Sequence, residues 1–432
     1  MDLSRYCKIY PSPKNTRNVI VFSTRNASIV EIPKKMVEDL PDADMSKEDR
    51  RTLKNLEFLV KDSEKEKKEL LAYIDDLNDL NKSLNIKLVM NLDCNLSCRY
   101  CFEGSRKGKH YMTRETADEF VEFVKRKVRA SDDFKEILVT FYGGEPLLSR
   151  ELIAYISAKL KPFAEERGIR YKSYLVTNGT LLNKGTVKTL KPLGLKEAYV
   201  TIDGPKENHD HFRPFRSGNG SFNLIVKNIK EVCGMIDVRL GGNFTQKNFR
   251  TYPKLLGYLL RNGLRPPKIN SVQFFPVVDE SADFGPSDFN EGCASVNEPW
   301  LFDASLFLRK EILKRGFALE KTAPGVCMME YKNNILVNYN GDIYKCPGLI
   351  SRREFRAGDI WTGIRDYRQS HSLDNWKNEE CLDCAYLPLC FGGCRYMKFV
   401  RDGNMDGVDC KKQYFDATLE TLVKQDIKYG LT

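Results

Sequence analysis

The chain has 432 residues, of which 41% are hydrophobic and 30% charged, a composition typical of a soluble globular protein with room for two or three domains. Its net charge of +10 comes from 69 basic and 59 acidic residues that are interspersed, without a dense basic tract or an apolar run of about 18 residues. We therefore expect no nucleic-acid partner, no membrane contact and a cytoplasmic location, where metal ligation is the expected use of most of the 13 cysteines and disulfides are not expected.

Residues 1–83 are predicted to form a separate domain. Two short apolar runs, 19–22 and 27–32, are joined by a turn and predict a β-hairpin. Helices are expected over 33–40, from Lys47 with Ser46 as the N-cap, and over 61–82.

Residues 84–300 show a regular alternation of strand and helix patterns, which predicts a parallel sheet with helical crossovers and therefore an α/β fold. The strands are expected at 86–92, 137–142, 171–176, 198–202, 236–240 and 272–278, and the helices at 113–128, 152–163, 186–193, 221–232 and 253–261.

The loop after the first of these strands holds Cys94, Cys98 and Cys101 in a C-x3-C-x2-C pattern. Three thiolates on one short loop can face a common point and hold an iron–sulfur cluster. A 4Fe–4S cluster has four irons, so one iron would lack a protein ligand and be open to another molecule. A zinc knuckle is the alternative, although zinc sites usually end with four ligands.

Further motifs follow the ends of the other predicted strands, where ligand-binding groups of β/α barrels gather. They include Gly143-Gly144-Glu145-Pro146, Asn178, Thr201, Asp203-Gly204-Pro205 and Gly241-Gly242-Asn243. Paired glycines let a backbone approach a ligand closely, and Arg213 suits a planar carboxylate. Tyr142, Phe222 and Phe274 are expected to belong to the core.

The cysteine spacing, with Tyr100 before the last cysteine and these motifs in order, resembles the radical S-adenosylmethionine (radical SAM) enzymes. The resemblance implies a partial (β/α)6 barrel over 84–300 and a 4Fe–4S cluster held by Cys94, Cys98 and Cys101. In that family S-adenosylmethionine chelates the open iron and is cleaved to a 5′-deoxyadenosyl radical. The implied contacts to S-adenosylmethionine are Tyr100, Gly143, Gly144, Glu145, Asn178, Thr201, Asp203 and Arg213.

The N-terminal hairpin and helices resemble, in layout, the winged-helix peptide-recognition element of many peptide-modifying radical SAM enzymes. The alternative is a structural extension that caps the barrel.

Residues 301–432 are expected to form a third, cysteine-rich domain. Its seven cysteines and Gly341 resemble the SPASM extension of radical SAM enzymes that modify peptides. The resemblance implies an outer 4Fe–4S cluster on Cys381, Cys384, Cys390 and Cys410 and an inner one on Cys327, Cys346 and Cys394, which makes three clusters in all. A zinc ribbon would need a multiple of four cysteines. Residues 328–345 hold no cysteine, so the inner cluster is either open or closed by a group such as Cys293.

The resemblance implies a radical SAM oxidoreductase that matures a ribosomally made precursor peptide. The peptide would bind through its leader, and a low-potential donor such as flavodoxin or ferredoxin would supply electrons. The favoured product is a thioether from a peptide cysteine to another residue's carbon. The alternatives are a carbon–carbon or carbon–oxygen crosslink, an epimerisation, or formylglycine formation in a sulfatase. A tRNA-modifying enzyme would need a basic appendage, and an electron-transfer protein would not explain the motifs at 143–146 and 203–205.

Overall fold

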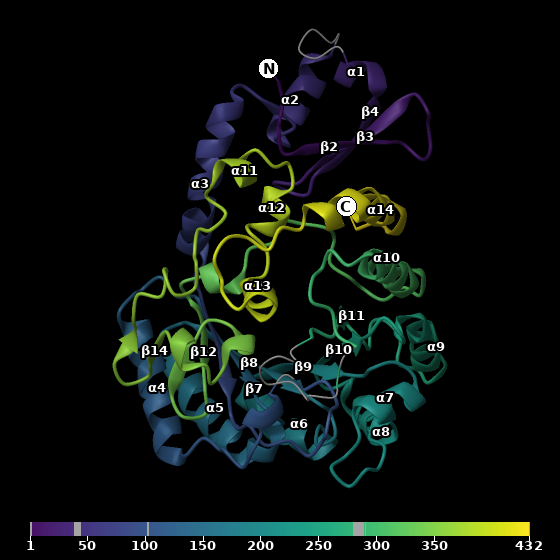
Figure 1. Cartoon of the computed structure of the whole chain (residues 1–432). Helices are drawn as coiled ribbons and strands as arrows, with labels where there is room; N and C mark the ends of the chain where they lie inside the picture. The colour runs from purple at the N-terminus through teal and green to yellow at the C-terminus, as the bar shows by residue number, and fades with distance from the viewer. Residues whose placement is uncertain (1, 39–44, 102, 280–288, 290, 432) are drawn as a thin grey trace.

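The computed structural model describes residues 2–38, 45–101, 103–279, 289 and 291–431, and a ten-stranded sheet lies at its centre (Figure 1). The strand order is β11-β10-β9-β8-β7-β6-β12-β13-β14-β15. The first six of these strands are all parallel to their neighbours, as predicted. They are β6 (Ser83–Val89), β7 (Glu136–Tyr142), β8 (Arg170–Thr177), β9 (Leu195–Thr201), β10 (Asp237–Phe244) and β11 (Ser271–Pro276).

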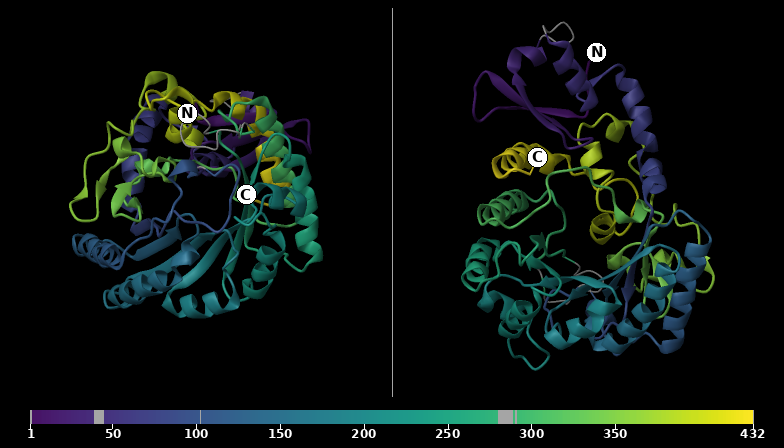
Figure 2. Two further views of the ribbon diagram at one scale, coloured as in Figure 1. Left: turned by 60° about the horizontal axis from the view of Figure 1, so that its bottom comes forward. Right: turned by 180° about the vertical axis from the view of Figure 1, so that it is seen from behind.

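Helices cover the outer face of this sheet, and the main apolar core lies between the two layers (Figure 2). Buried and partly buried residues alternate along the strands, and this pattern produces the arrangement. In β6, Leu84, Ile86 and Leu88 are buried, whereas the intervening Asn85 and Lys87 are only partly buried. The helices between the strands are α4 (Arg114–Arg129), α5 (Arg150–Glu165), α6 (Lys184–Leu190), α7 (Lys206–Phe212), α8 (Phe222–Val232) and α9 (Tyr252–Arg261).

All six predicted strands are confirmed, but the fifth is longer than expected. Gly241, Gly242 and Asn243 were expected after that strand and instead lie inside β10, paired with β11. The glycines have a packing role, because a Cβ atom on Gly241 would lie 1.8 Å from the Tyr199 hydroxyl. The short helix α7 was not predicted.

The N-terminal unit is built on a three-stranded antiparallel sheet of β2 (Cys7–Pro11), β3 (Asn18–Ser23) and β4 (Ile29–Pro33). The predicted hairpin β3–β4 is confirmed, whereas β2 was missed. The other elements are β1 (Asp2–Leu3), which pairs with β5 (Leu59–Val60), and helices α1 (Lys34–Glu38), α2 (Lys47–Asn55) and α3 (Ser63–Leu80). Ser46 caps α2 as predicted, whereas residues 39–40 of the first expected helix lie outside the described residues.

The N-terminal sheet packs directly on the C-terminal cysteine segment. Ile20 and Phe22 share an apolar cluster with Tyr386 and Phe415, and Cys384 and Cys390 border it. The Thr24 hydroxyl donates to the Ala385 carbonyl oxygen at 2.6 Å. Helix α3 then leads from this unit down to the large sheet (Figure 1).

The C-terminal part adds four strands to the sheet. Its last four helices lie between the sheet and the N-terminal unit in Figure 1. Strand β12 pairs with β6 in parallel, and the predicted turn at Gly341 joins β12 to β13. Gly341 has a φ of +85°, which favours glycine. The elements are α10 (Pro299–Lys314), β12 (Asn334–Val337), β13 (Asp342–Tyr344), β14 (Gly358–Asp359), β15 (Gly363–Ile364), α11 (Glu379–Leu382), α12 (Leu387–Cys390), α13 (Arg395–Asp402) and α14 (Lys412–Tyr429).

Candidate active site

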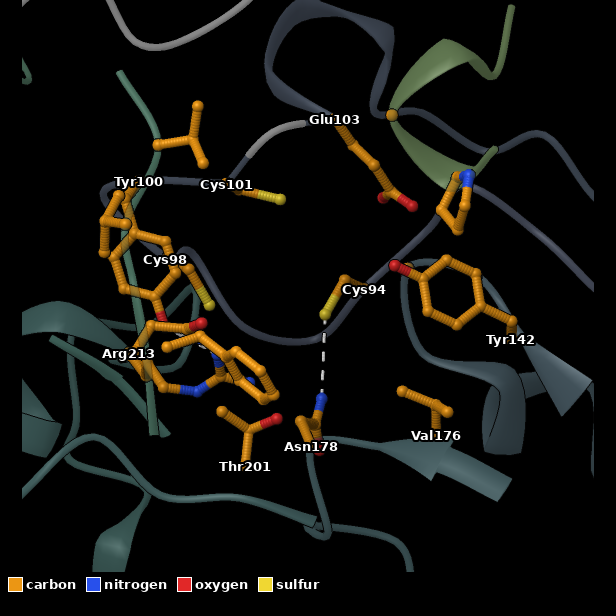
Figure 3. Close-up of a pocket in the computed structure, with 18 of the residues that line it drawn as sticks. Cys94, Cys98, Tyr100, Cys101, Glu103, Tyr142, Val176, Asn178, Thr201 and Arg213 are labelled. Carbon is orange, nitrogen blue, oxygen red and sulfur yellow. Dashed lines mark hydrogen bonds between the residues drawn. The ribbon is translucent and has the colours of Figure 1, made fainter. Parts of the chain in front are cut away.

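A cavity of about 420 Å³ lies at the carboxyl ends of the parallel strands (Figure 3). The last residues of β7, β8 and β9, namely Tyr142, Thr177 and Thr201, form part of its wall. The three cysteines of the loop after β6 line it as well. Parallel strands bring their carboxyl ends to one edge of a sheet, so motifs that are far apart in the sequence meet here.

The cysteine thiols of this loop are desolvated. Burial raises the pKa of Cys94 to about 12, and the neighbouring Cys98 adds to the increase. Burial also raises the pKa of Cys101, which the Lys107 ammonium opposes. Such thiols ionise when a metal binds them, because the metal favours the thiolate form. The set therefore suits an iron–sulfur cluster.

In such a cluster each thiolate binds its own iron, so the sulfurs need not converge on one ion. Among the described residues, no three His, Cys, Asp or Glu side chains form a site for a single metal ion.

Asp93 holds the first cysteine in place. Its Oδ1 accepts hydrogen bonds from the Cys94 amide at 2.9 Å and from Arg216 at 2.6 Å, and its Oδ2 accepts one from the Tyr111 hydroxyl at 2.5 Å. The position of Asp93 directly before Cys94 is the sequence signal that could have revealed this role.

The glycine pair after β7 packs against the cysteine loop. A Cβ on Gly144 would lie 2.1 Å from the Asp93 carbonyl oxygen, and one on Gly143 would lie 2.3 Å from that of Asn91. The Gly144 amide donates to Asn91 O at 3.0 Å. The glycines therefore allow two loops to approach each other, and both also line the cavity.

Glu145 lies behind the cavity wall and is fully buried. Its carboxylate accepts hydrogen bonds from the Thr177 hydroxyl at 2.8 Å, the Leu147 amide at 3.0 Å and the Asn178 amide at 2.8 Å. Glu145 therefore joins the ends of β7 and β8. Asn178 does line the cavity, and its side-chain nitrogen Nδ2 lies 3.6 Å from Cys94 Sγ (Figure 3).

A second network joins Tyr100, Asp203 and Arg213. The Tyr100 hydroxyl donates to Asp203 and accepts a hydrogen bond from Arg213 Nη1 at 2.9 Å. Burial raises the pKa of Asp203, and the Arg213 guanidinium 3.9 Å away opposes that increase. Tyr100 and Arg213 line the cavity, whereas the fully buried Asp203 lies behind them.

His209 supports this network. Its Nδ1 accepts from the Asp203 amide at 3.1 Å, and its Nε2 lies 3.0 Å from the Ser221 hydroxyl. Burial lowers the pKa of His209 to about 3, so the ring is neutral at physiological pH.

Several lining residues were not predicted from the sequence. Tyr142 was expected in the core and instead faces the cavity, whereas Phe222 is buried in the core as expected. The others that sequence reasoning missed include Glu103, Lys107, Tyr199, Phe275, Pro276, Pro347, Gly348 and Tyr396. Pro347, Gly348 and Tyr396 come from the C-terminal part, which sequence reasoning could not place over the barrel.

Three C-terminal cysteines form a group next to this wall. Burial raises the pKa of Cys346 to about 12, with further increases from Cys394 and Cys327. Burial also raises the pKa of Cys394, again with a contribution from Cys327. Cys346 directly precedes the cavity-lining Pro347.

A second group lies under the N-terminal sheet. The pKa of Cys381 is raised by burial and by Cys384 and Cys410. The pKa of Cys390 is raised to about 12 by burial, Cys384 and Cys381. The thiols that influence one another's pKa therefore fall into two groups, and the assignment of a cluster to each group stays a prediction.

Cys293 lies apart from both groups in its electrostatic surroundings. It is fully buried, and its pKa is raised to about 12 by burial and by the carboxylates of Glu298 and Asp279. Its apolar cluster nevertheless contains Met397, and Cys394 packs against that cluster.

No helix in the described part of the chain has the length and apolar character needed to cross a membrane.

Residues 88–244 match the sequence family described as the Radical SAM superfamily. The serine-type anaerobic sulfatase-maturating enzyme of Bacteroides thetaiotaomicron is 24% identical over 348 residues, which cover 71% of this chain and 81% of that enzyme. The PqqA peptide cyclase of Granulibacter bethesdensis is 23% identical over 341 residues, which cover 73% of this chain and 83% of the cyclase.

Solved structures share the fold at lower sequence identity. Native anSMEcpe with bound AdoMet and the Cp18Cys peptide superposes with a TM-score of 0.62 and 20% identity, covering 80% of this chain and 99% of that one. Streptococcus suis SuiB bound to precursor peptide SuiA superposes with a TM-score of 0.55 and 14% identity, covering 95% of this chain and 98% of that one. The SuiB match therefore extends into the N-terminal unit.

Proposed function

Because this chain is an enzyme of the radical SAM superfamily, we propose that it modifies a ribosomally made precursor peptide and forms a thioether from a peptide cysteine. The observation that carries this proposal is the composition of the cavity wall. One side holds Cys94, Cys98 and Cys101, and another holds residues adjacent to Cys346 and Cys394. A substrate in the cavity would contact the first cysteine group directly and the sequence neighbours of Cys346 and Cys394.

We propose that Cys94, Cys98 and Cys101 hold the 4Fe–4S cluster that binds S-adenosylmethionine. When bound, this pair of cofactors supplies a radical that abstracts a substrate hydrogen. Asn178, Thr201 and Arg213, which line the cavity, would contact S-adenosylmethionine together with the backbone of Gly143 and Gly144. Glu145 and Asp203 would orient these groups from behind the wall.

Replacing Arg213 by lysine is expected to raise the dissociation constant for S-adenosylmethionine about tenfold, roughly 1.4 kcal/mol. Lysine keeps the positive charge near Asp203 but loses the planar fork that suits a carboxylate. Calorimetric titration of the reconstituted protein would measure the constant. Arg250→Lys, an exposed position paired with Asp303, is the control. Equal affinity in wild type and Arg213→Lys would exclude Arg213 as a carboxylate contact.

We further propose that the four-cysteine group and the three-cysteine group hold the outer and the inner auxiliary clusters. Their desolvated thiols suit metal binding for the reason given for the first loop. The inner group has three thiols, which leaves one iron open to a further ligand.

The N-terminal unit is proposed to bind the leader of the precursor at the outer edge of β4. Within the described residues, β4 pairs with β3 alone, so its other edge is open. Ser23 N donates to Ser28 O, and Lys34 N donates to Arg17 O. In an antiparallel pair, every second residue of a strand is hydrogen-bonded to the neighbouring strand, so the amides of Ile29 and Glu31 point away from β3 to the open edge. A leader could pair with these amides as an added strand.

Amide hydrogen exchange at Ile29 and Glu31 is therefore expected to slow about tenfold or more when the full precursor is added. The core peptide without its leader should leave these rates unchanged. Hydrogen exchange suits this question better than deletion. Removing residues 1–83 would expose Tyr386 and Phe415 to solvent, because residues of the N-terminal sheet pack against them. Protection in β2 and none in β4 would rule out this binding edge.

Formylglycine formation in a sulfatase is the second candidate, because anaerobic sulfatase-maturating enzymes are among the relatives. Incubation with a short cysteine-containing precursor peptide, and separately with a sulfatase peptide, would discriminate between them. Formation of a thioether lowers the mass of the precursor by two hydrogen atoms and consumes its free thiol. Formylglycine instead gives an aldehyde that reacts with a hydrazine. An aldehyde with the sulfatase peptide and no change in the precursor would overturn the thioether proposal.

A further inference from the structure

Glu103 is a buried acid on the wall of this cavity. Its exposure is 3%, and neither carboxylate oxygen has a hydrogen-bond donor within the part of the chain that the structure describes. Figure 3 shows the carboxylate directed into the cavity, between Cys101 and the ring of Tyr142.

Other buried acids nearby are satisfied. Glu145 accepts three hydrogen bonds, and Glu330 pairs with Arg395. A buried carboxylate without a partner costs free energy, so native proteins keep such a group where a ligand completes it. Glu103 therefore marks a place for a ligand group that donates hydrogen bonds or carries positive charge.

The basic residues that follow Glu103 in the chain are engaged elsewhere. The Lys107 ammonium is hydrogen-bonded to Cys101, and Arg106 Nη1 donates to the Ile350 carbonyl oxygen. Both cations lower the pKa of the Glu103 carboxylate, but neither donates a hydrogen bond to it, so we expect its hydrogen-bond donor to come from a bound molecule.

The position of Glu103 points to the substrate rather than to S-adenosylmethionine. In Figure 3, Asn178, Thr201 and Arg213 lie on one side of Cys94, and Glu103 and Tyr142 lie on the other. The cavity wall also contains Pro347, which directly follows Cys346, and Tyr396, which is two residues after Cys394. Glu103 thus belongs to the part of the cavity that the proposed S-adenosylmethionine contacts leave free.

We infer that Glu103 binds a lysine or arginine side chain of the peptide and so selects substrates with a basic residue beside the modified position. This inference rests on the proposed function, because it assumes a peptide in the cavity. A cation would satisfy both carboxylate oxygens and neutralise the buried charge, which a single backbone amide would not do.

The test is equilibrium binding of two short probe peptides to the reconstituted enzyme with S-adenosylmethionine present. Acetyl-Ala-Lys-Ala-amide and its norleucine counterpart differ in the charged group but have the same aliphatic chain. Wild type should bind the lysine peptide at least about tenfold more tightly. Glu103→Gln should lose this preference, and Glu115→Gln, an exposed position at the start of α4, should retain it.

A second measurement separates ligand binding from a structural role. If Glu103 is unpaired in the free enzyme, Glu103→Gln should raise the thermal midpoint of the peptide-free protein by ~2 °C and keep its iron content. The inference is overturned by equal binding of the two peptides to wild type, by a preference that survives in Glu103→Gln, or by a lower midpoint with loss of iron. No turnover is measured, so these outcomes are independent of whether the enzyme forms a thioether.

Discussion

Replacing Cys94, Cys98 and Cys101 together by alanine should abolish the cleavage of S-adenosylmethionine and remove about a third of the bound iron. These thiols share one loop, whereas the seven C-terminal cysteines form two separate groups. On the proposed assignment the loop would hold its cluster without help from the other groups, and those groups would not depend on the loop.

Iron content and release of 5′-deoxyadenosine would be measured under anaerobic conditions after reconstitution. Cys233→Ala is the matched control, because Cys233 lies at the end of α8, where its pKa is raised mainly by burial. Release of 5′-deoxyadenosine by the triple variant would show that the site assignment is wrong.

Adding a cysteine-containing precursor should change the spectrum of the inner cluster, and the Cys→Ser precursor should not. The inner group supplies three thiols, so a substrate thiolate is a suitable fourth ligand. Cys346 directly precedes the cavity-lining Pro347, so a substrate sulfur bound at the proposed inner cluster would lie beside the cavity. Holding both reacting groups in one cavity converts bond formation into an intramolecular step.

Cys293 provides the decisive control for this experiment. Its apolar cluster also has Cys394 packed against it, so closure of the cluster by Cys293 is the alternative. If substrate is the ligand, Cys293→Ala should keep the inner cluster and the spectral change. An unchanged wild-type spectrum, together with loss of the cluster in Cys293→Ala, would show that the protein itself closes the site. Cys346→Ala should abolish the crosslinked product, and Cys233→Ala should retain it.

Local sequence patterns predicted the elements that depend on neighbouring residues. Each of the six strands was found from its apolar run, and Ser46 was identified as a helix cap from the residues that follow it. The strands β13, β14 and β15 have only two or three residues each, and β12 is stabilised by pairing with the distant β6, so their sequences carry weaker signals.

The candidate site was predicted in part. Asn178, Thr201 and Arg213 were selected by motif and position, and they line the cavity. Glu145 and Asp203 were selected by the same reasoning but lie behind the wall, because a motif does not reveal which way a side chain points. Glu103 has no motif of its own, and its significance arises from burial without a partner.

The sequence by itself determined the cysteine spacing, the alternation of strands and helices, and the placement of motifs at strand ends. These features depend on contacts within a few residues, which periodicity and spacing record directly. Only the tertiary structure decided that the C-terminal part contributes Pro347, Gly348 and Tyr396 to the cavity wall and that the N-terminal unit covers one group of C-terminal cysteines. Those arrangements rest on contacts such as Arg5 with Asp383, whose partners are 378 residues apart, and no local pattern encodes such a pairing.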